Sequence, residues 1–211
     1  FDNVLVAFSG GKDSGVLLNL CYNYADEHGL LDKLTMYHLD YEAQYQMTTE
    51  YVTRTFLEQF PGIRKMWYCV PIKAQSACAL GEPYWTPWDA AKKKLWVRAM
   101  PENPYVVHEG NLDVPFRHGM VDYEFQDKLS RHFAKKRGTT AVMVGLRADE
   151  SLNRYAAVAR GKKRRSYEGR KWITQTSAVT ANVYPLYDWR VSDIWTATAL
   201  SLIHISEPTR L

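Results

Sequence analysis

The stretch Val4-Leu5-Val6-Ala7-Phe8-Ser9-Gly10-Gly11-Lys12-Asp13-Ser14-Gly15-Val16-Leu17-Leu18 decides the fold of this chain. Largely β-forming residues run into Ser-Gly-Gly, and an apolar pattern of helical period follows, which predicts a strand, a tight turn and a helix N-terminus. Two adjacent glycines let the backbone turn sharply and approach a ligand, while the first N–H groups of the helix point at it. With the helix dipole and Lys12 beside it, the turn is a predicted phosphate site.

An ordinary strand-to-helix turn, capped by Asp13 or Ser14, is the structural alternative. The spacing is not that of a Walker A loop, because no glycine lies five residues before Gly11, and Asp13 stands where a Walker loop has Ser or Thr. The complete hexapeptide at a strand–helix junction favours phosphate binding over a simple cap.

Ser9-Gly10-Gly11-Lys12-Asp13-Ser14 resembles the PP-loop of the adenine nucleotide α-hydrolase superfamily, which includes ATP pyrophosphatases and phosphoadenosine phosphosulfate (PAPS) reductases. Two later stretches are similar, in the same order, to segments of the PAPS reductase family: Gly145-Leu146-Arg147-Ala148-Asp149-Glu150-Ser151-Leu152-Asn153-Arg154 and Tyr184-Pro185-Leu186-Tyr187-Asp188-Trp189-Arg190-Val191-Ser192-Asp193-Ile194-Trp195. Leu39-Asp40-Tyr41-Glu42-Ala43-Gln44-Tyr45 and a Trp-rich segment resemble the IbrA/YbdN-like branch, whose members are described as regulators or co-activators. The resemblance extends to about Ala199.

Composition fits one α/β domain within the 211 residues, since 46% are hydrophobic and 24% charged. No apolar run approaches the ~18 residues of a membrane span, and no leader precedes the first strand. We therefore expect a cytoplasmic protein with no membrane association. The chain opens on Phe1 without an initiator Met, so we expect the natural start to be missing.

The three cysteines, Cys21, Cys69 and Cys78, form no C-x-x-C pair, and the six histidines lack ligand spacing. Neither a disulfide framework, a protein-bound metal nor an iron–sulfur cluster is expected. PAPS reductases, as a family, use a cysteine near the C-terminus as nucleophile. No cysteine follows Cys78, so we predict that this chain does not reduce PAPS.

Strand and helix patterns alternate over residues 33–39, 46–59 and 64–72, which predicts an open, mainly parallel twisted sheet with helices on both faces. Ligands of such sheets lie outside the carboxyl ends of the strands. Asp40 follows the second strand, where it would hold a ribose hydroxyl or a metal-bound phosphate. A cap on the next turn is an equal alternative.

Residues 73–118 form a Trp- and Pro-rich insertion in which substrate specificity is expected to reside. Trp85, Trp88 and Trp96, with nearby lysines, are able to stack on a base. The favoured interpretation is a small subdomain whose aromatic residues pack on the core.

A helix over residues 121–137 and a strand over 140–144 lead to Gly145, and Arg147, Glu150 and Arg154 follow at a strand's carboxyl end. Arginine has the fork geometry for phosphate or sulfate, and Glu150 and Arg154 are spaced to pair on a helix. A purely structural salt bridge is the alternative. A further strand over 183–186 precedes a helix that Asp193 caps or orients.

The segment from Arg160 to Lys171 holds seven basic residues and one Glu168, an excess of six positive charges against +4 for the whole chain. A solvated loop, closure over a nucleotide and contact with nucleic acid or a protein partner all remain open. Residues 200–211 resemble a translated sequencing adaptor, so residues 1–199 are the expected single domain and 200–211 a tail foreign to it.

Two functions follow from the pattern. The first is nucleotidyl or sulfur transfer at the phosphate or phosphosulfate end of ATP or PAPS, with Lys12 and Arg147 as catalytic residues and Mg²⁺ assisting. The second is a non-catalytic, nucleotide-sensing co-regulator whose basic segment contacts DNA or a partner. The expected nucleotide site comprises Ser9, Gly10, Gly11, Lys12, Asp13, Ser14, Asp40, Gly145, Arg147, Glu150 and Arg154.

Overall fold

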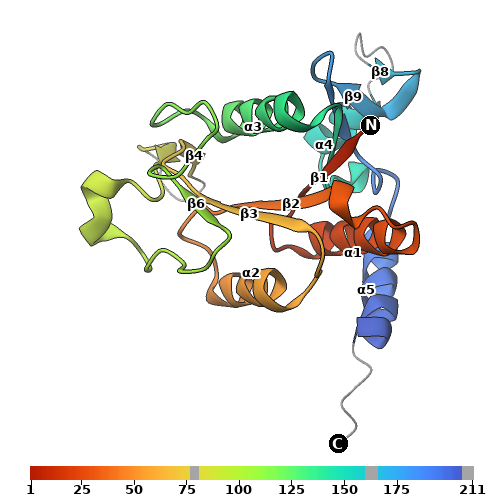
Figure 1. Ribbon diagram of the computed structural model, residues 1–211, viewed down its shortest axis with the longest axis horizontal. Helices are drawn as coiled ribbons and strands as arrows, with labels where there is room; N and C mark the ends of the chain where they lie inside the picture. The colour runs from red at the N-terminus through yellow and green to blue at the C-terminus, as the bar shows by residue number, and fades with distance from the viewer. Residues whose placement is uncertain (77–80, 160–165, 206–211) are drawn as a thin grey trace, which may run out of the picture.

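The computed structural model describes residues 1–76, 81–159 and 166–205, and its main feature is a twisted sheet between helices (Figure 1). The strand order among the described residues is β6-β3-β2-β1-β7-β10-β9-β8. Six strands run parallel: β1 (Asn3–Ala7), β2 (Leu34–Leu39), β3 (Arg64–Cys69), β6 (Val106–His108), β7 (Thr140–Met143) and β10 (Thr180–Val183). Strand β9 (Arg170–Gln175) pairs antiparallel with β10, and β8 (Ser166–Tyr167) pairs antiparallel with β9. The predicted α/β fold with a mainly parallel sheet is confirmed.

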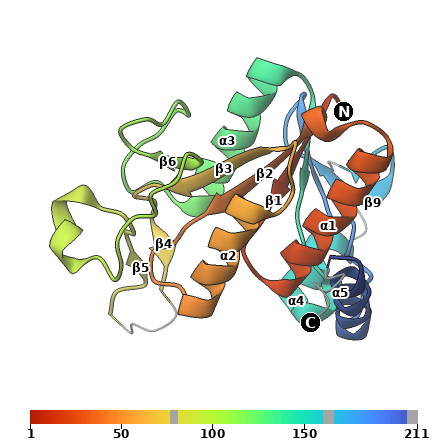
Figure 2. The same cartoon turned by 60° about the horizontal axis from the view of Figure 1, so that its bottom comes forward.

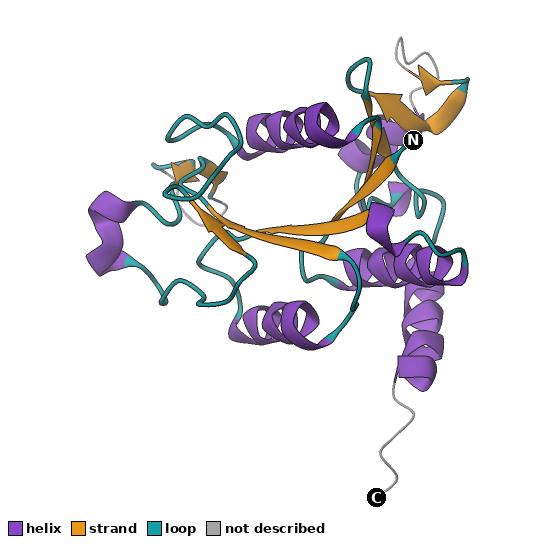
Figure 3. Cartoon of the chain, in the orientation of Figure 1, coloured by secondary structure: helices purple, strands orange, loops and turns teal. Residues whose placement is uncertain are grey.

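Helices cover both faces of this sheet (Figures 1 and 3). Helices α1 (Lys12–Glu27) and α2 (Gln46–Glu58) lie against one face, and α3 (Asp122–Arg137) lies against the other. Helix α4 (Leu152–Ala159) follows β7, and α5 (Val191–Ile205) packs beside α1 (Figure 2). Short 3₁₀ turns are η1 (Leu31–Lys33), η2 (Ala90–Leu95) and η3 (Ala148–Glu150). No helix in the described part of the chain is long and apolar enough to cross a membrane.

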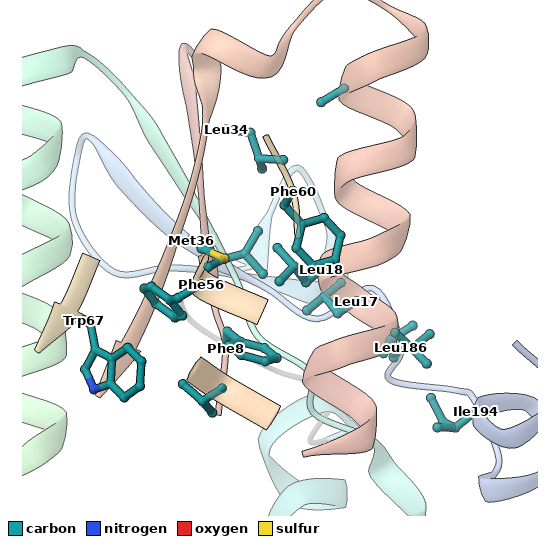
Figure 4. Close-up of a cluster of buried hydrophobic side chains, with 14 of the residues drawn as sticks. Phe8, Leu17, Leu18, Leu34, Met36, Phe56, Phe60, Trp67, Leu186 and Ile194 are labelled. Atoms are coloured by element: carbon teal, nitrogen blue, oxygen red, sulfur yellow. The ribbon is translucent and has the colours of Figure 1, made fainter. Parts of the chain in front are cut away.

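The central strands are buried on both sides, because successive side chains point to opposite faces and helices cover each face. Met36 and Trp67 face the cluster beneath α1 and α2, whereas their neighbours Tyr37 and Tyr68 face α3. Figure 4 shows the first cluster, where Phe8, Met36 and Phe56 meet side chains of α1. Each such buried side chain contributes about 1.5–3 kcal/mol relative to exposure, which fixes both helix layers on the sheet.

The chain changes direction at the pair β1–β7. From β1 it passes outward through α1, β2, α2 and β3, and it then returns through α3 to β7 on the opposite side of β1. A crevice forms outside the carboxyl ends of neighbouring strands where the direction reverses, and this is where ligands bind in open α/β sheets. The segments after β1 and β7 are therefore neighbours.

The insertion adds small elements at one side of the sheet. Strand β6 extends the sheet by pairing with β3, while β4 (Ala74–Gln75) and β5 (Tyr84–Trp85) form a separate two-stranded ribbon. Trp88 is 2% exposed and belongs to the core under α1 and α2. This burial confirms the core interpretation for Trp88, whereas Trp85 and Trp96 are half-buried.

One predicted segment is shifted in the structure, and two others lie partly outside the described residues. The strand expected at 183–186 is Thr180–Val183, because Tyr184 begins the turn before Tyr187. Residues 166–171 of the basic segment belong to the β8–β9 hairpin, whose turn residues Glu168 and Gly169 both have positive φ. Residues 160–165 lie outside the described residues. Helix α5 continues through residues 200–205, and 206–211 again lie outside the described part.

Candidate functional site

A cavity of about 440 Å³ lies outside the carboxyl ends of β1, β2 and β7. It is open to solvent on one side and has charged groups together with aromatic and aliphatic ones in its wall. The lining residues are Ala7, Phe8, Ser9, Gly11, Lys12, Asp13, Ser14, Tyr37, Leu39, Tyr41, Gln126, Val144, Gly145, Leu146, Glu150 and Arg154. Two sequence segments predicted to meet, the glycine turn and the Gly145 segment, do meet here.

The glycine turn is held by two serines and by a glycine in the left-handed region. Gly10 has φ +82°, and a Cβ there would lie 2.7 Å from the Val52 Cγ2 atom of α2, so only glycine fits. The Ser14 hydroxyl donates to the Gly11 carbonyl at 2.9 Å and accepts from the Ser9 amide at 3.2 Å. These contacts hold the turn in this conformation without a ligand.

Helix α1 begins directly after this turn. Its first intrahelical bond runs from the Gly15 amide to the Gly11 carbonyl at 2.9 Å, so the amides of Lys12, Asp13 and Ser14 have no acceptor within the helix. All three residues line the cavity. Three free N–H groups at the positive end of a 16-residue helix make an anion-binding surface.

Gly145 joins the β7 segment to this helix start. A Cβ on Gly145 would lie 3.1 Å from the Ser14 nitrogen and 3.2 Å from the Asp13 carbonyl carbon. Backbone atoms cannot move aside cheaply at such distances, so the bare glycine lets the two segments touch. The predicted participation of Gly145 in the site thus has a steric cause.

Arg147 lies beneath the cavity rather than in its wall. Its side chain is 4% exposed, and its Nε atom is 3.3 Å from Asp13 Oδ1, within ion-pair distance although not aligned as a hydrogen bond. Asp149 and Glu150 also pair with its guanidinium. The direct phosphate contact predicted for Arg147 is therefore not formed by this arrangement, because three carboxylates enclose the guanidinium.

Glu150 and Arg154 form the ion pair that their spacing predicts, and both line the cavity. Lys12 pairs with Asp13 at 3.3 Å and is about one-third exposed. Lys12 and Arg154 are thus the two cationic side chains in the wall among the described residues.

These features, a glycine turn before a helix and an Arg-containing turn after the next parallel strand, can be compared with known proteins. The family model described as "Phosphoadenosine phosphosulfate reductase domain" matches residues 3–207. The chain belongs to the PAPS reductase family. It is 33% identical over 196 residues to "Uncharacterized protein YbdN" of Escherichia coli (strain K12). The match covers 92% of this chain and 46% of YbdN, so the chain spans about half the length of that relative.

Asp40 of this PAPS reductase family member does not reach the cavity. Its carboxylate is fully buried and accepts from the indole Nε1 of Trp67 at 2.7 Å, while Arg98 Nη2 lies 2.6 Å from both carboxylate oxygens. The ribose or metal role predicted for Asp40 is corrected on these grounds. The capping alternative describes it better, because the Glu42 amide also donates to it at 2.8 Å.

Glu42 extends this buried network into the insertion. Its two carboxylate oxygens accept from the backbone amides of Trp88 at 2.8 Å and Val97 at 2.7 Å. Arg98 Nε donates to the Glu42 carbonyl at 2.9 Å. No sequence pattern indicates this partnership, because Glu42 precedes its hydrogen-bond donors by more than 40 residues.

Tyr37, Tyr41 and Gln126 form a part of the cavity wall that the motifs did not predict. The Tyr37 hydroxyl donates to Gln126 Oε1 at 2.9 Å, and the Tyr41 hydroxyl donates to Asp122 at 2.9 Å. Burial raises the pKa of both phenols, so they remain neutral donors at physiological pH. The period-two alternation of β2, which puts Tyr37 and Leu39 on one face, is a signal that could have found Tyr37; Gln126 gave none.

The family's chemistry raises the question of thiols and metals. Cys21 and Cys69 do not line the cavity, and burial raises the pKa of Cys21 to about 12. Cys78 lies outside the described residues. Within the described residues, no group of three or more His, Cys, Asp and Glu side chains is placed to hold a metal. Mg²⁺ bound through nucleotide phosphates needs only one or two carboxylates. Asp13 lines the cavity, but its two carboxylate oxygens are paired with Lys12 and Arg147.

Proposed function

We propose that this chain binds an adenine nucleotide with the phosphate or phosphosulfate end at the Ser9–Ser14 turn, and acts on that end by nucleotidyl or sulfur transfer. The observation that carries the proposal is the set of three acceptor-free amides of Lys12, Asp13 and Ser14 in the wall of one cavity. Anions bind such helix starts through aligned N–H groups and the helix dipole. Family membership supports the adenine nucleotide as the ligand class.

The chemistry in this proposal is positioning and charge neutralisation. Lys12 would contact the phosphates, and Mg²⁺ carried by a triphosphate would neutralise charge on the reacting phosphate. Arg147 acts on the loop, not on the substrate, because it is enclosed by carboxylates.

Sulfonucleotide reduction requires a thiolate at the sulfur atom, and neither Cys21 nor Cys69 lines the cavity. A cysteine from another segment or another protein would have to supply the nucleophile. Nucleotidyl transfer at the α-phosphate makes no such demand on the described residues.

Calorimetric titration with ATP, AMP, PAPS and APS tests the proposal. Gly11 lines the cavity and has an ordinary extended backbone, so Gly11→Val adds a branched side chain to the wall, and we expect it to weaken binding about tenfold or more. Gly81→Val is the matched control, since a Cβ at Gly81 meets nothing within 4 Å.

Unchanged affinity in Gly11→Val would contradict the site. Product analysis of the same samples separates the mechanisms: AMP transfer with pyrophosphate release supports the enzyme. Tight binding without turnover supports the nucleotide-sensing co-regulator instead.

A further inference from the structure

Six charged side chains of the described residues join in one line of ion pairs beneath and beside the cavity. Lys12 pairs with Asp13, and Asp13 pairs with Arg147. Arg147 pairs in turn with Asp149 and with Glu150, and Glu150 pairs with Arg154. The line runs Lys12–Asp13–Arg147–Glu150–Arg154, with Asp149 as a branch at Arg147. Its three positive and three negative formal charges make it neutral without a ligand.

The centre of the line is closed. Arg147 is 4% exposed and faces carboxylates of Asp13, Asp149 and Glu150, an excess of negative charge around one guanidinium. Drawing this side chain toward a ligand would leave buried charge unpaired, which is strongly unfavourable. An incoming anion at Arg147 would also meet those three carboxylates.

The two ends of the line are open. Lys12 and Arg154 each have one carboxylate partner, have side chains 34% and 47% exposed, and line the cavity. Ion pairs at that exposure are weak because water screens them. An anion is therefore able to replace the carboxylate at either end without disturbing the centre.

We infer that the two arginines have separate roles: Arg154, together with Lys12, contacts the anionic end of the nucleotide, whereas Arg147 is a positioning residue that holds Asp13 in the glycine turn. This inference rests on the proposed function. It also specifies the ligand, because two cations at separate ends of the line favour nucleotides with two or more anionic groups, such as ATP or PAPS, over AMP.

Titration of ATP and AMP into the wild type and Arg154→Gln tests the first role. We expect Arg154→Gln to weaken ATP binding about tenfold and AMP binding far less, with an unchanged melting temperature. Arg117→Gln is the control, since Arg117 forms an exposed pair with Glu124 away from the cavity. Wild-type affinity for ATP in Arg154→Gln would overturn this role, and equal losses for ATP and AMP would overturn the anionic-end contact.

A double-mutant cycle tests the second role. We expect Arg147→Lys to weaken ATP and AMP binding by the same factor, and to add little in an Asp13→Asn background, because Arg147 acts through Asp13. Amide exchange at Gly15 in the ligand-free protein reports the same positioning, and should quicken in Arg147→Lys. Additive losses of affinity in the double variant, or an unchanged exchange rate at Gly15, would overturn the positioning role of Arg147.

If Arg147→Lys does not fold, the Arg147–Asp13 contact is broken from the other side with Asp13→Asn, and amide exchange at Gly15 is measured in that variant. There, quickened exchange supports the positioning role and unchanged exchange overturns it. If the wild type binds neither nucleotide, the proposed function fails and this inference fails with it. If the wild type binds but the variants do not behave as expected, only this inference fails.

Discussion

Gly145 and Ser14 pack backbone against backbone, so closely that a Cβ on Gly145 would lie 3.1 Å from the Ser14 nitrogen. The contact joins the segment after β7 to the first turn of α1, at the point where the strand order reverses on either side of β1. The two walls of the cavity are thereby fixed relative to each other by main-chain atoms.

Gly145→Ala should therefore separate these walls. We expect a loss of about 1–3 kcal/mol in the free energy of unfolding, as for other overpacked sites, together with weaker nucleotide binding. Urea unfolding and calorimetry measure the two effects, and Gly81→Ala serves as control because a Cβ there meets no atom within 4 Å. A variant with wild-type stability and affinity would show that the contact is not required.

Gly10 and Gly11 should respond differently to the same substitution. Gly10→Ala combines a φ of +82° with a contact of 2.7 Å to Val52, so we expect a cost of about 1–3 kcal/mol. Gly11 has φ −84°, and a Cβ there meets only Ser9 Oγ at 3.4 Å, so Gly11→Ala should leave stability nearly unchanged. Equal stability of the two variants in urea would refute the assignment of strain to Gly10.

Asp40→Asn should be among the most damaging single changes outside the cavity. It leaves the mostly buried Arg98 guanidinium without its countercharge, which costs about 3–5 kcal/mol in buried pairs. The double variant Asp40→Asn with Arg98→Met should recover a large part of that loss. Asp127→Asn, which breaks an exposed pair with Arg131, should cost no more than ~1 kcal/mol.

His38 should make stability depend on pH. Burial lowers its pKa, and Nδ1 lies 2.8 Å from the Phe8 carbonyl oxygen, so the folded state holds a neutral ring. Below a pH of about 6.5 the imidazole is protonated in the unfolded chain but stays neutral in the folded state. The contribution of His38 to stability is therefore full above that pH and is lost as the pH falls toward the lowered pKa. The slope from this group approaches ~1.4 kcal/mol per pH unit.

Urea unfolding between pH 7.5 and 5.5 measures this slope. His38→Asn puts an amide N–H where Nδ1 meets the Phe8 carbonyl and should flatten the curve, whereas His28→Asn, at an exposed position, should not. The same slope in His38→Asn and the wild type would assign the pH dependence to other groups.

Cys21 should be unreactive in the folded protein. Burial raises its pKa to about 12, so very little thiolate exists at neutral pH. In a Cys78→Ser, Cys69→Ala background we expect labelling by a disulfide reagent at pH 7.5 to be roughly a hundred times slower than in urea. Comparable rates in both states would mean that Cys21 is accessible and ionised.

Local patterns were sufficient to predict most of the architecture. The glycine turn, the period-two strands and the amphipathic helices each follow from side chains a few residues apart, so β1, α1, β2, α2, α3 and β7 appear within a few residues of their predicted bounds. The β8–β9 hairpin was not predicted, because the segment was interpreted from its basic residues and not from the turn residues Glu168-Gly169.

The residues around the cavity could be predicted where a motif exists and could not where a contact is long-range. Ser9 to Ser14, Gly145, Glu150 and Arg154 all line or support the cavity, as the motifs predict. Asp40 was misplaced because its position at a strand end indicates a ligand site, whereas its actual partner, Arg98, lies 58 residues later. No spacing rule connects those two residues.

Asp40 and Glu42 together receive hydrogen bonds from both ends of the segment between Trp88 and Arg98. The insertion is consequently not a module that can be exchanged alone. A chimera that carries residues 73–118 into another PAPS reductase family scaffold would need Asp40 and Glu42 transplanted with them, and replacing the insertion here would leave two buried carboxylates to be redesigned as well.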